Sequence, residues 1–314
     1  METLIDFAVG FSEGVVWPWP IAIYLGLAGM SGGAFIAAAM CRLVMGQKEI
    51  SPLYKSASLI SLVTILLGMV CLIFDLTKML DFWKILIFYN PTSVMSIGVM
   101  GLLVFIPTMF LAALCAWADN KFVAPILNAL SFLKPIVAFL TRWINVITWI
   151  GLIFGLVICA YTGFLISTLV RFPLINTAVL PALFVASGLS AGIAASSFGA
   201  LLLGADHESH DVHALHISEY CVMVIEALCI FMIAFSLLVG STVQQETVRA
   251  FVEGFWAWEF WIGVVGIGFL VPAFMSVCEK CFGVLAISAL CSVLGMFCLR
   301  FFILYAGQIY GIGA

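Results

Sequence analysis

The chain has 314 residues, of which 65% are hydrophobic and 9% charged, and its formal net charge is −4. Soluble domains contain roughly 45–50% apolar and about 25% charged residues, so this composition excludes a water-soluble globular protein. Uncharged runs of about 20 residues or more recur along the chain. This length suits a membrane-spanning helix and is too long for the strands of a β-barrel.

Eight such runs are expected to form transmembrane helices, at residues 18–41, 57–77, 92–117, 143–169, 179–204, 217–241, 256–277 and 282–306. The predicted fold is an all-α polytopic membrane protein, a single membrane domain over residues 1–314 with eight transmembrane helices in two four-helix bundles. The first 17 residues contain no Lys or Arg. They lack the basic start of a cleavable signal peptide, so we expect the first helix to be retained.

The distribution of Lys and Arg predicts the orientation, because these residues collect on the cytoplasmic side of a membrane. With the N-terminus outside, the inner loops hold Arg42, Lys48, Lys55, Lys121, Lys134, Arg142 and Lys280. The outer side then holds Lys78, Lys84, Arg171 and Arg249. The excess on the inner side predicts that both termini lie outside, where the outer loops form a face for an external partner.

The first expected helix carries Tyr24 and a run of small residues, GMSGGAF at 29–35, and the fifth carries a similar run, GLSAGIA at 188–194. The two runs lie four helices apart and therefore cross the membrane in the same direction. They indicate either an internal duplication, with halves at 17–170 and 178–310, or two small-residue faces that allow close helix packing.

Two polar residues follow in the outer half of the membrane, where ionisable or hydrogen-bonding groups are functional candidates. Asp75 closes the second helix and is either a functional carboxylate or a helix-end charge paired with Lys78. Tyr161, in the fourth helix, is either a ligand-binding or a packing residue. Between them, the segment 121–142 predicts an interfacial helical link and not a further span.

All four histidines, His207, His210, His213 and His216, lie three residues apart in one segment between the fifth and sixth helices. On a helix this spacing could hold a transition metal, and in a loop it would only keep two helix ends in water. Because no fixed ligand spacing such as HExxH is present, we expect no metal site. Haem in a membrane bundle needs axial histidines from facing helices, so a haem-binding quinol oxidase is not expected either.

The last three helices add two charges within the membrane and one short cysteine motif. Glu226 lies about ten residues into the sixth helix and is a candidate for proton transfer. Arg300, within the eighth helix, either keeps the charge of the site in balance or neutralises Glu226 or Asp75 as a structural pair. Cys278 and Cys281 form a single CxxC, which without a second ligand pair is weak support for metal or redox chemistry.

Tyr24, Asp75, Tyr161 and Arg300 all fall in the outer half of the membrane under the predicted orientation. Tyr24 is either a ligand-binding residue or a tyrosine of the interfacial aromatic belt. Oxidation of a quinol releases two electrons and two protons, so its site needs a group that hydrogen-bonds a ring oxygen and a carboxylate that accepts a proton. The surrounding pocket should be largely apolar. This combination of residues predicts a quinol site.

At these residues the chain resembles the NrfD/PsrC family, the quinone-binding membrane subunits of polysulfide, thiosulfate and cytochrome-c nitrite reductase complexes. The resemblance covers nearly the whole chain and is carried by WPWPIAIYL (17–25), FWKxxxFYNPTSVMSIGVM (82–100), AYTGFLIS (160–167), LPALFVASGLSAG (180–192) and LRFFILYAGQ (299–308). The motifs look closer to the nitrite-reductase type.

The resemblance implies a menaquinone site near the outer face, with menaquinone or menaquinol as a bound substrate and no haem or iron–sulfur cluster in this chain. Tyr161 matches a quinone-contacting tyrosine and Asp75 an acidic proton-transfer position. Tyr24 falls where some members have histidine, and its hydroxyl can still donate a hydrogen bond. Ile21 falls where they have asparagine, and its side chain cannot form one.

The implied partners are a four-cluster ferredoxin-like iron–sulfur subunit on the outer face and a terminal reductase, either a multihaem cytochrome c or a molybdopterin enzyme. We expect the chain to be surrounded by the lipid of a bacterial cytoplasmic membrane. We do not expect it to bind nucleic acid. Two rival hypotheses remain. One is a secondary transporter or proton-conducting subunit, supported by Glu226, and the other is a purely structural anchor.

Overall fold

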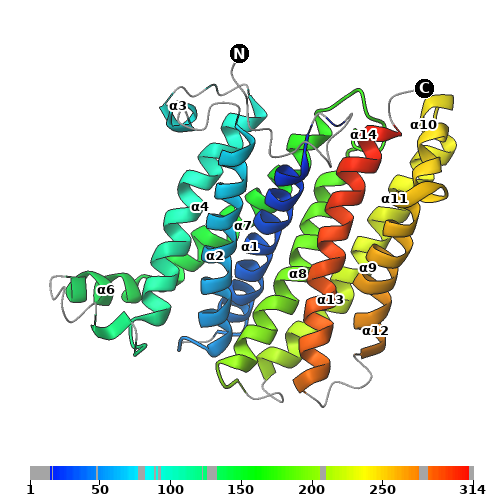
Figure 1. Ribbon diagram of the computed structural model, residues 1–314. Helices are drawn as coiled ribbons and strands as arrows, with labels where there is room; N and C mark the ends of the chain where they lie inside the picture. Colours follow the sequence, from blue (N-terminus) through cyan, green and yellow to red (C-terminus); the bar gives the residue numbers. More distant parts are fainter. Residues whose placement is uncertain are drawn as a thin grey trace.

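A computed structural model describes residues 15, 17–46, 49–76, 82–87, 90, 93–121, 123–125, 133–205, 210–275 and 282–310, and all regular structure within these ranges is helical (Figure 1). Eight helical segments in the described ranges are long and apolar enough to cross a membrane. This confirms the predicted all-α membrane fold, and the predicted spans agree with the observed ones to within a few residues at most ends.

Five spans are single α-helices and a sixth lies within a longer helix. They are α1 (Trp19–Val44), α2 (Pro52–Asp75), α4 (Val94–Trp117), α7 (Ile144–Ser167), α8 (Leu180–Leu202) and α9 (His210–Val239). The seventh span joins α11 (Gly254–Trp258), the π-helical segment η3 (Glu259–Leu270) and α12 (Val271–Met275). The eighth joins α13 (Phe282–Phe301), a π-helical turn η5 (Phe302–Ala306) and α14 (Gly307–Ile309).

The start of α2 illustrates how local sequence sets the ends of these helices. Ser51 is the N-cap, and its hydroxyl accepts a hydrogen bond from the backbone N–H of Tyr54 at 3.2 Å. Pro52 occupies the first helical position, where its fixed φ suits the helix and its missing N–H costs no hydrogen bond.

Short helices lie at the two ends of the molecule. The start of α1, the end of α14, α3 (Phe82–Ile87) and α10 (Thr242–Thr247) lie at one end, and α6 (Leu133–Arg142) lies near the other (Figure 1). Following the orientation predicted from charge, we call these the outer and the inner end. α6 has polar and apolar residues on opposite faces, in agreement with the interfacial helix expected within 121–142.

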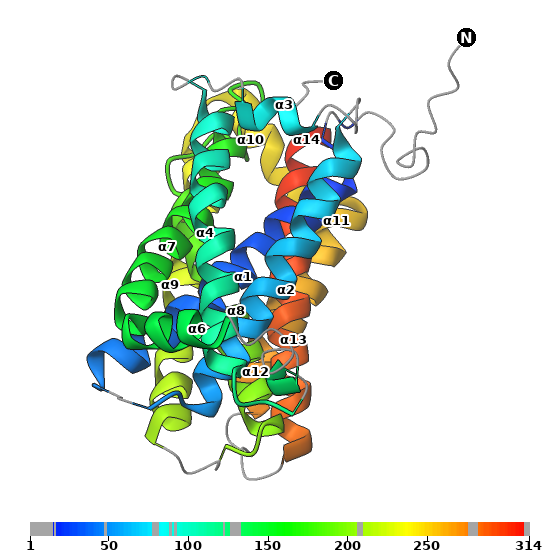
Figure 2. The same cartoon turned by 90° about the vertical axis from the view of Figure 1, so that its left-hand side faces the viewer.

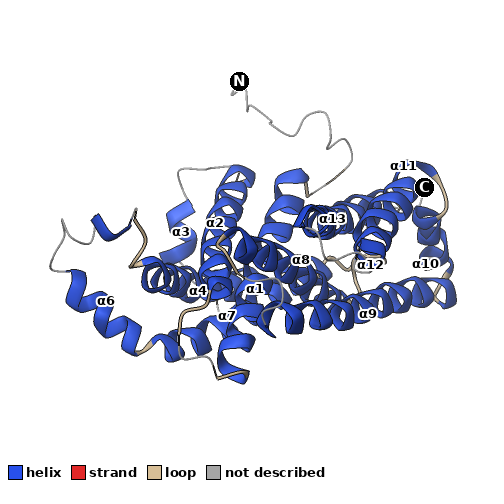
Figure 3. Cartoon of the chain, turned by 90° about the horizontal axis from the view of Figure 1, so that it is seen from below, coloured by secondary structure: helices blue, strands red, loops and turns tan. Residues whose placement is uncertain are grey.

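Two glycine-rich helices, α1 and α8, form the centre of the molecule. In the view from below, α2, α4 and α7 lie on one side of this pair and α9, α12 and α13 on the other (Figure 3). α1 packs against α2, α7 and α8, and α8 packs against α9 and α13. The most apolar stretch of α1 is 89% buried within the protein, whereas that of α9 is only 28% buried.

The two small-residue runs found in the sequence meet each other at this centre. A Cβ added to Gly188 would lie 2.8 Å from the carbonyl oxygen of Gly29, and one added to Gly192 would overlap the backbone of Gly33. The runs therefore form a close packing face between parallel helices. The internal duplication and the division into two four-helix bundles remain predictions, because α1 contacts helices on both sides.

Candidate functional site

A largely apolar cavity lies in the outer half of the molecule, between α2 and α4. Figure 2 shows these two helices running side by side and drawing apart toward the outer end, with α1 behind them. The centre of a water molecule can move within a volume of about 320 Å³ in this cavity. This volume is within the range of small-molecule sites. Its apolar lining is Met69, Leu72, Ile73, Leu76, Met95, Val99, Leu102, Leu103, Ile106, Pro107 and Leu165.

Three of the residues singled out in the sequence, Tyr24, Asp75 and Tyr161, line this cavity together. They come from α1, α2 and α7, and the side chains of Tyr24 and Tyr161 are only 1% and 7% exposed. Asp75, the last residue of α2, is half-buried at the outer end of the cavity. Its predicted partner Lys78 lies outside the described residues.

The two phenol groups are available to a ligand. Within the described ranges neither hydroxyl forms a hydrogen bond, and the two phenols lie close enough to interact electrostatically. Tyr O–H groups buried in apolar surroundings usually have a partner. Two such tyrosines lining one cavity therefore indicate a site for a ligand with hydrogen-bonding oxygens.

Gly98 of α4 holds Tyr161 in place, a role that was not recognised in the sequence. A Cβ at position 98 would overlap the Tyr161 ring, so only glycine lets the ring lie against α4. The nearby Pro107 has no N–H, so α4 supplies no helical donor for the carbonyl of Leu103, another cavity residue.

The structure separates the remaining predicted residues from this cavity. Ile21 is buried in α1 but is not part of the cavity lining. Arg300 of α13 is fully buried, with its guanidinium 3.5 Å from the centre of the Phe184 ring and Nη2 donating to the Phe184 carbonyl oxygen at 3.1 Å. Within the described part of the chain, its Nε and Nη1 have no hydrogen-bond partner.

Glu226 of α9 is the charge that Arg300 faces. Glu226 is 6% exposed, and the charges of the two side chains interact. Of the two carboxylates expected to pair with Arg300, Glu226 is the one whose charge it interacts with, while Asp75 lines the outer cavity. A buried carboxylate and guanidinium near each other are far less costly than either charge alone.

Two further carboxylates of the second half were not recognised as candidates in the sequence. Glu219 on α9 is 8% exposed and accepts a hydrogen bond from Ser292 Oγ at 3.3 Å. Glu259 begins the π-helical segment η3, and its Oε2 is buried without a partner among the described residues. Both lie within a few residues of a predicted span end, where a charge looks like an ordinary boundary residue.

The metal-ligand candidates give no site within the described ranges, where no group of three or more His, Cys, Asp or Glu side chains could hold a metal ion. His207, Cys278 and Cys281 lie outside the described residues. The backbone of His210, His213 and His216 belongs to the first turns of α9, but their side chains are also outside the described part.

Comparisons with known proteins cover almost the whole chain. A family model described as "Polysulphide reductase, NrfD" matches residues 9–312. The C subunit of the polysulfide reductase of Wolinella succinogenes is 37% identical, over 94% of this chain and 95% of that protein. "Protein NrfD homolog" of Haemophilus influenzae is 35% identical, over 97% and 98%. "Protein NrfD" of Escherichia coli K12 is 33% identical, over 95% and 96%.

These identities do not favour the nitrite-reductase type over the polysulfide type. The motifs in the sequence had looked closer to the nitrite-reductase type.

Proposed function

The chain belongs to the polysulphide reductase, NrfD, family of membrane subunits of respiratory reductase complexes, and we propose that it is the quinone-binding anchor of such a complex. It exchanges electrons between menaquinol in the membrane and an external iron–sulfur subunit. The observation that carries this proposal is the convergence of Tyr24, Asp75 and Tyr161 on one apolar cavity between α2 and α4.

The cavity fits a quinone in both shape and chemistry. Its walls are apolar side chains that suit a ring and an isoprenoid tail, and its polar groups are two tyrosine hydroxyls and one carboxylate. Tyr24 and Tyr161 hold and orient the ring oxygens by donating hydrogen bonds to them. The apolar walls exclude water, which strengthens these hydrogen bonds.

Asp75 is placed to move the protons that quinol oxidation releases. It is half-buried at the end of α2, where the cavity reaches the outer end of the molecule. A carboxylate within reach of a quinol hydroxyl, directly or through one water, accepts its proton. The outer position of Asp75 then lets that proton leave on the same side as the electron-accepting subunit.

The orientation with both termini outside, in a bacterial cytoplasmic membrane, is part of the same proposal. Among the described cations, Arg42, Lys55 and Lys121 lie at or just beyond the inner ends of α1, α2 and α4, and Lys134 and Arg142 belong to α6. Only Lys84, Arg171 and Arg249 belong to segments at the outer end. The outer end then receives the iron–sulfur subunit. This subunit passes electrons to a terminal reductase, which is either a multihaem cytochrome c or a molybdopterin enzyme.

Binding of a menaquinol analogue to the purified chain tests the site. We expect saturable binding by the wild type, weakened roughly tenfold by Tyr161→Phe, because a hydrogen bond in an apolar pocket is worth about 1.5 kcal/mol. Asp75→Asn should keep binding and slow turnover of the assembled complex. Tyr54→Phe is the matched control, since Tyr54 bonds Thr148 at 2.9 Å, outside the cavity.

Unchanged binding by Tyr161→Phe would remove the ring-oxygen role of this tyrosine. Absence of binding by the folded wild type, alone and in the complex, would reject the quinone site altogether.

A second candidate function, proton conduction, is favoured by the buried charges of the second half. Glu226, Arg300 and Glu219 lie away from the outer cavity. If Glu226 transfers protons during quinol oxidation, the Glu226→Gln complex should translocate fewer protons per electron, and normal stoichiometry would remove that role. A transporter working alone would move its substrate in liposomes without partner subunits, whereas an electron-transfer anchor is inert there.

A further inference from the structure

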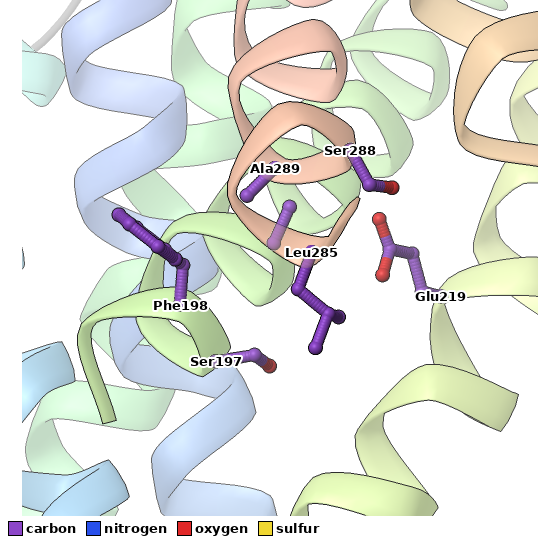
Figure 4. A pocket seen from close by; sticks show the side chains of 7 residues that line it. Ser197, Phe198, Glu219, Leu285, Ser288 and Ala289 are labelled. Atoms are coloured by element: carbon purple, nitrogen blue, oxygen red, sulfur yellow. The ribbon is translucent and has the colours of Figure 1, made fainter. Parts of the chain in front are cut away.

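A small cavity lies between α8, α9 and α13 in the inner half of the molecule (Figure 4). It leaves about 10 Å³ for the centre of a water molecule, which is the space that one bound water needs. Ser197, Glu219 and Ser288 each contribute a polar side chain to its lining. In Figure 4 these side chains extend from three different helices toward one space, beside Leu285.

The Ser197 hydroxyl in this cavity has unfilled hydrogen-bonding capacity. Ser197 is 2% exposed, and its hydroxyl has no hydrogen-bond partner among the described residues. The Glu219 carboxylate across the cavity accepts a hydrogen bond from Ser292, and a carboxylate has about four acceptor positions in all. A buried water typically makes about three hydrogen bonds to groups of this kind. A hydroxyl buried in a membrane protein without such a partner would be strongly disfavoured.

The cavity also lies on a line of polar side chains that leads toward the middle of the membrane. Glu219 and Glu226 are seven residues apart on α9, which places them on one face with an axial separation of about 10 Å. Arg300 faces Glu226 and has two donors, Nε and Nη1, without a partner in the described ranges. The cavity lies on the inner side of Glu219, because its lining residues Leu285 and Ser288 come before Ser292 on α13, which begins at the inner end. Direct proton transfer over the remaining distance of about 10 Å to Glu226 is too long, so further water is needed between the two carboxylates.

We propose that Ser197 and Glu219 bind one internal water, and that Glu219 is the inner-side proton-uptake site that supplies Glu226. Ser292 is a positioning residue, because its hydroxyl orients the Glu219 carboxylate. The bound water passes a proton from the inner side to the Glu219 carboxylate, and Glu219 passes it through further water to the Glu226 carboxylate, which releases it toward the outer side in each turnover. No electron moves in this step. The relay rests on the proton-transfer role proposed for Glu226, and its uptake is coupled to the proposed quinol oxidation at the outer cavity.

The test uses the complete complex in proteoliposomes whose lumen corresponds to the inner side. Quinol oxidation by an external acceptor is started, and a trapped pH dye reports protons taken from the lumen per electron. We expect Glu219→Gln to abolish this uptake, since an amide cannot carry the proton. Ser197→Val, which fills the cavity with apolar carbon, should do the same. Quinol oxidation measured with a protonophore present should stay near the wild-type rate in both.

Matched controls separate the site from general damage. Glu246→Gln changes an exposed carboxylate of α10, and Ser236→Val changes a hydroxyl on α9 that bonds the carbonyl of Ile233 in its own helix. Both should leave lumenal uptake unchanged. Glu219→Asp, which keeps a carboxylate, should retain part of it.

Two different failures are distinguishable. Unchanged uptake in Glu219→Gln, or no lumenal uptake by the wild-type complex, overturns the inference and leaves quinol oxidation standing. Equal oxidation rates for wild type and Tyr161→Phe instead contradict the role of Tyr161 in the proposed quinol site, whatever the lumenal signal shows.

Discussion

The ring of Tyr161 lies against α4 only because position 98 has no side chain. Gly98→Ala would place a Cβ inside the ring, so the tyrosine must shift and its hydroxyl must move from its place in the cavity. We expect this substitution to weaken menaquinol-analogue binding about as much as Tyr161→Phe and to destabilise the fold by about 1–3 kcal/mol.

Gly101→Ala is the control for this prediction, since the added Cβ would lie 3.2 Å from Ile158 Cδ1, the flexible end of a side chain. Calorimetric titration and thermal unfolding in detergent measure both effects. Wild-type affinity in Gly98→Ala would show that the position of the Tyr161 ring does not matter for binding.

Arg300 and Glu226 are residues whose effects depend on each other. Removing the positive charge with Arg300→Met leaves the Glu226 carboxylate buried without its countercharge, a change that typically costs about 3–5 kcal/mol. The double substitution Arg300→Met with Glu226→Gln removes both charges and should recover much of this loss. Additive losses in thermal unfolding of the single and double variants would contradict the pairing.

At the scale of helices, the sequence predicted the spans well because each depends on a local property, an apolar run of sufficient length. The grouping of Tyr24, Asp75 and Tyr161 could be expected from their common depth. The role of Gly98 could not, because it depends on how α4 packs against α7. Glu219 was overlooked for a related reason: a carboxylate near a span end looks like a boundary residue until its neighbouring helices are known.

The approach of α1 to α8 depends on glycine at their contact. Gly192→Val would drive a branched side chain into the backbone of Gly33 and Ala34, and neither backbone can yield as a side chain would. We expect a loss of about 3 kcal/mol in unfolding free energy. Gly283→Val, where an added Cβ meets nothing within 4 Å, is the control. Equal melting temperatures for the two variants would argue against a rigid α1–α8 contact.

The whole molecule places its proposed redox site and its proposed partner at the same end. The proposed quinol cavity lies in the outer half, so electrons would have a short path to a partner subunit docked over α3 and α10. α3 presents Trp83, which is 46% exposed, with Lys84 Nζ 5.8 Å from its ring centre. An exposed aromatic beside a cation is a common feature of protein interfaces.

Charge reversal tests this docking face. Lys84→Glu should weaken association of the iron–sulfur subunit and lower its on-rate, most clearly at low salt, because exposed charges act mainly by steering encounter. Lys134→Glu makes the same change on exposed α6, near the inner end, and should have no effect. The comparison also reports orientation. Loss of association in Lys134→Glu and not in Lys84→Glu would place the partner at the inner end, where electrons would have to cross most of the membrane to leave the Tyr161 cavity.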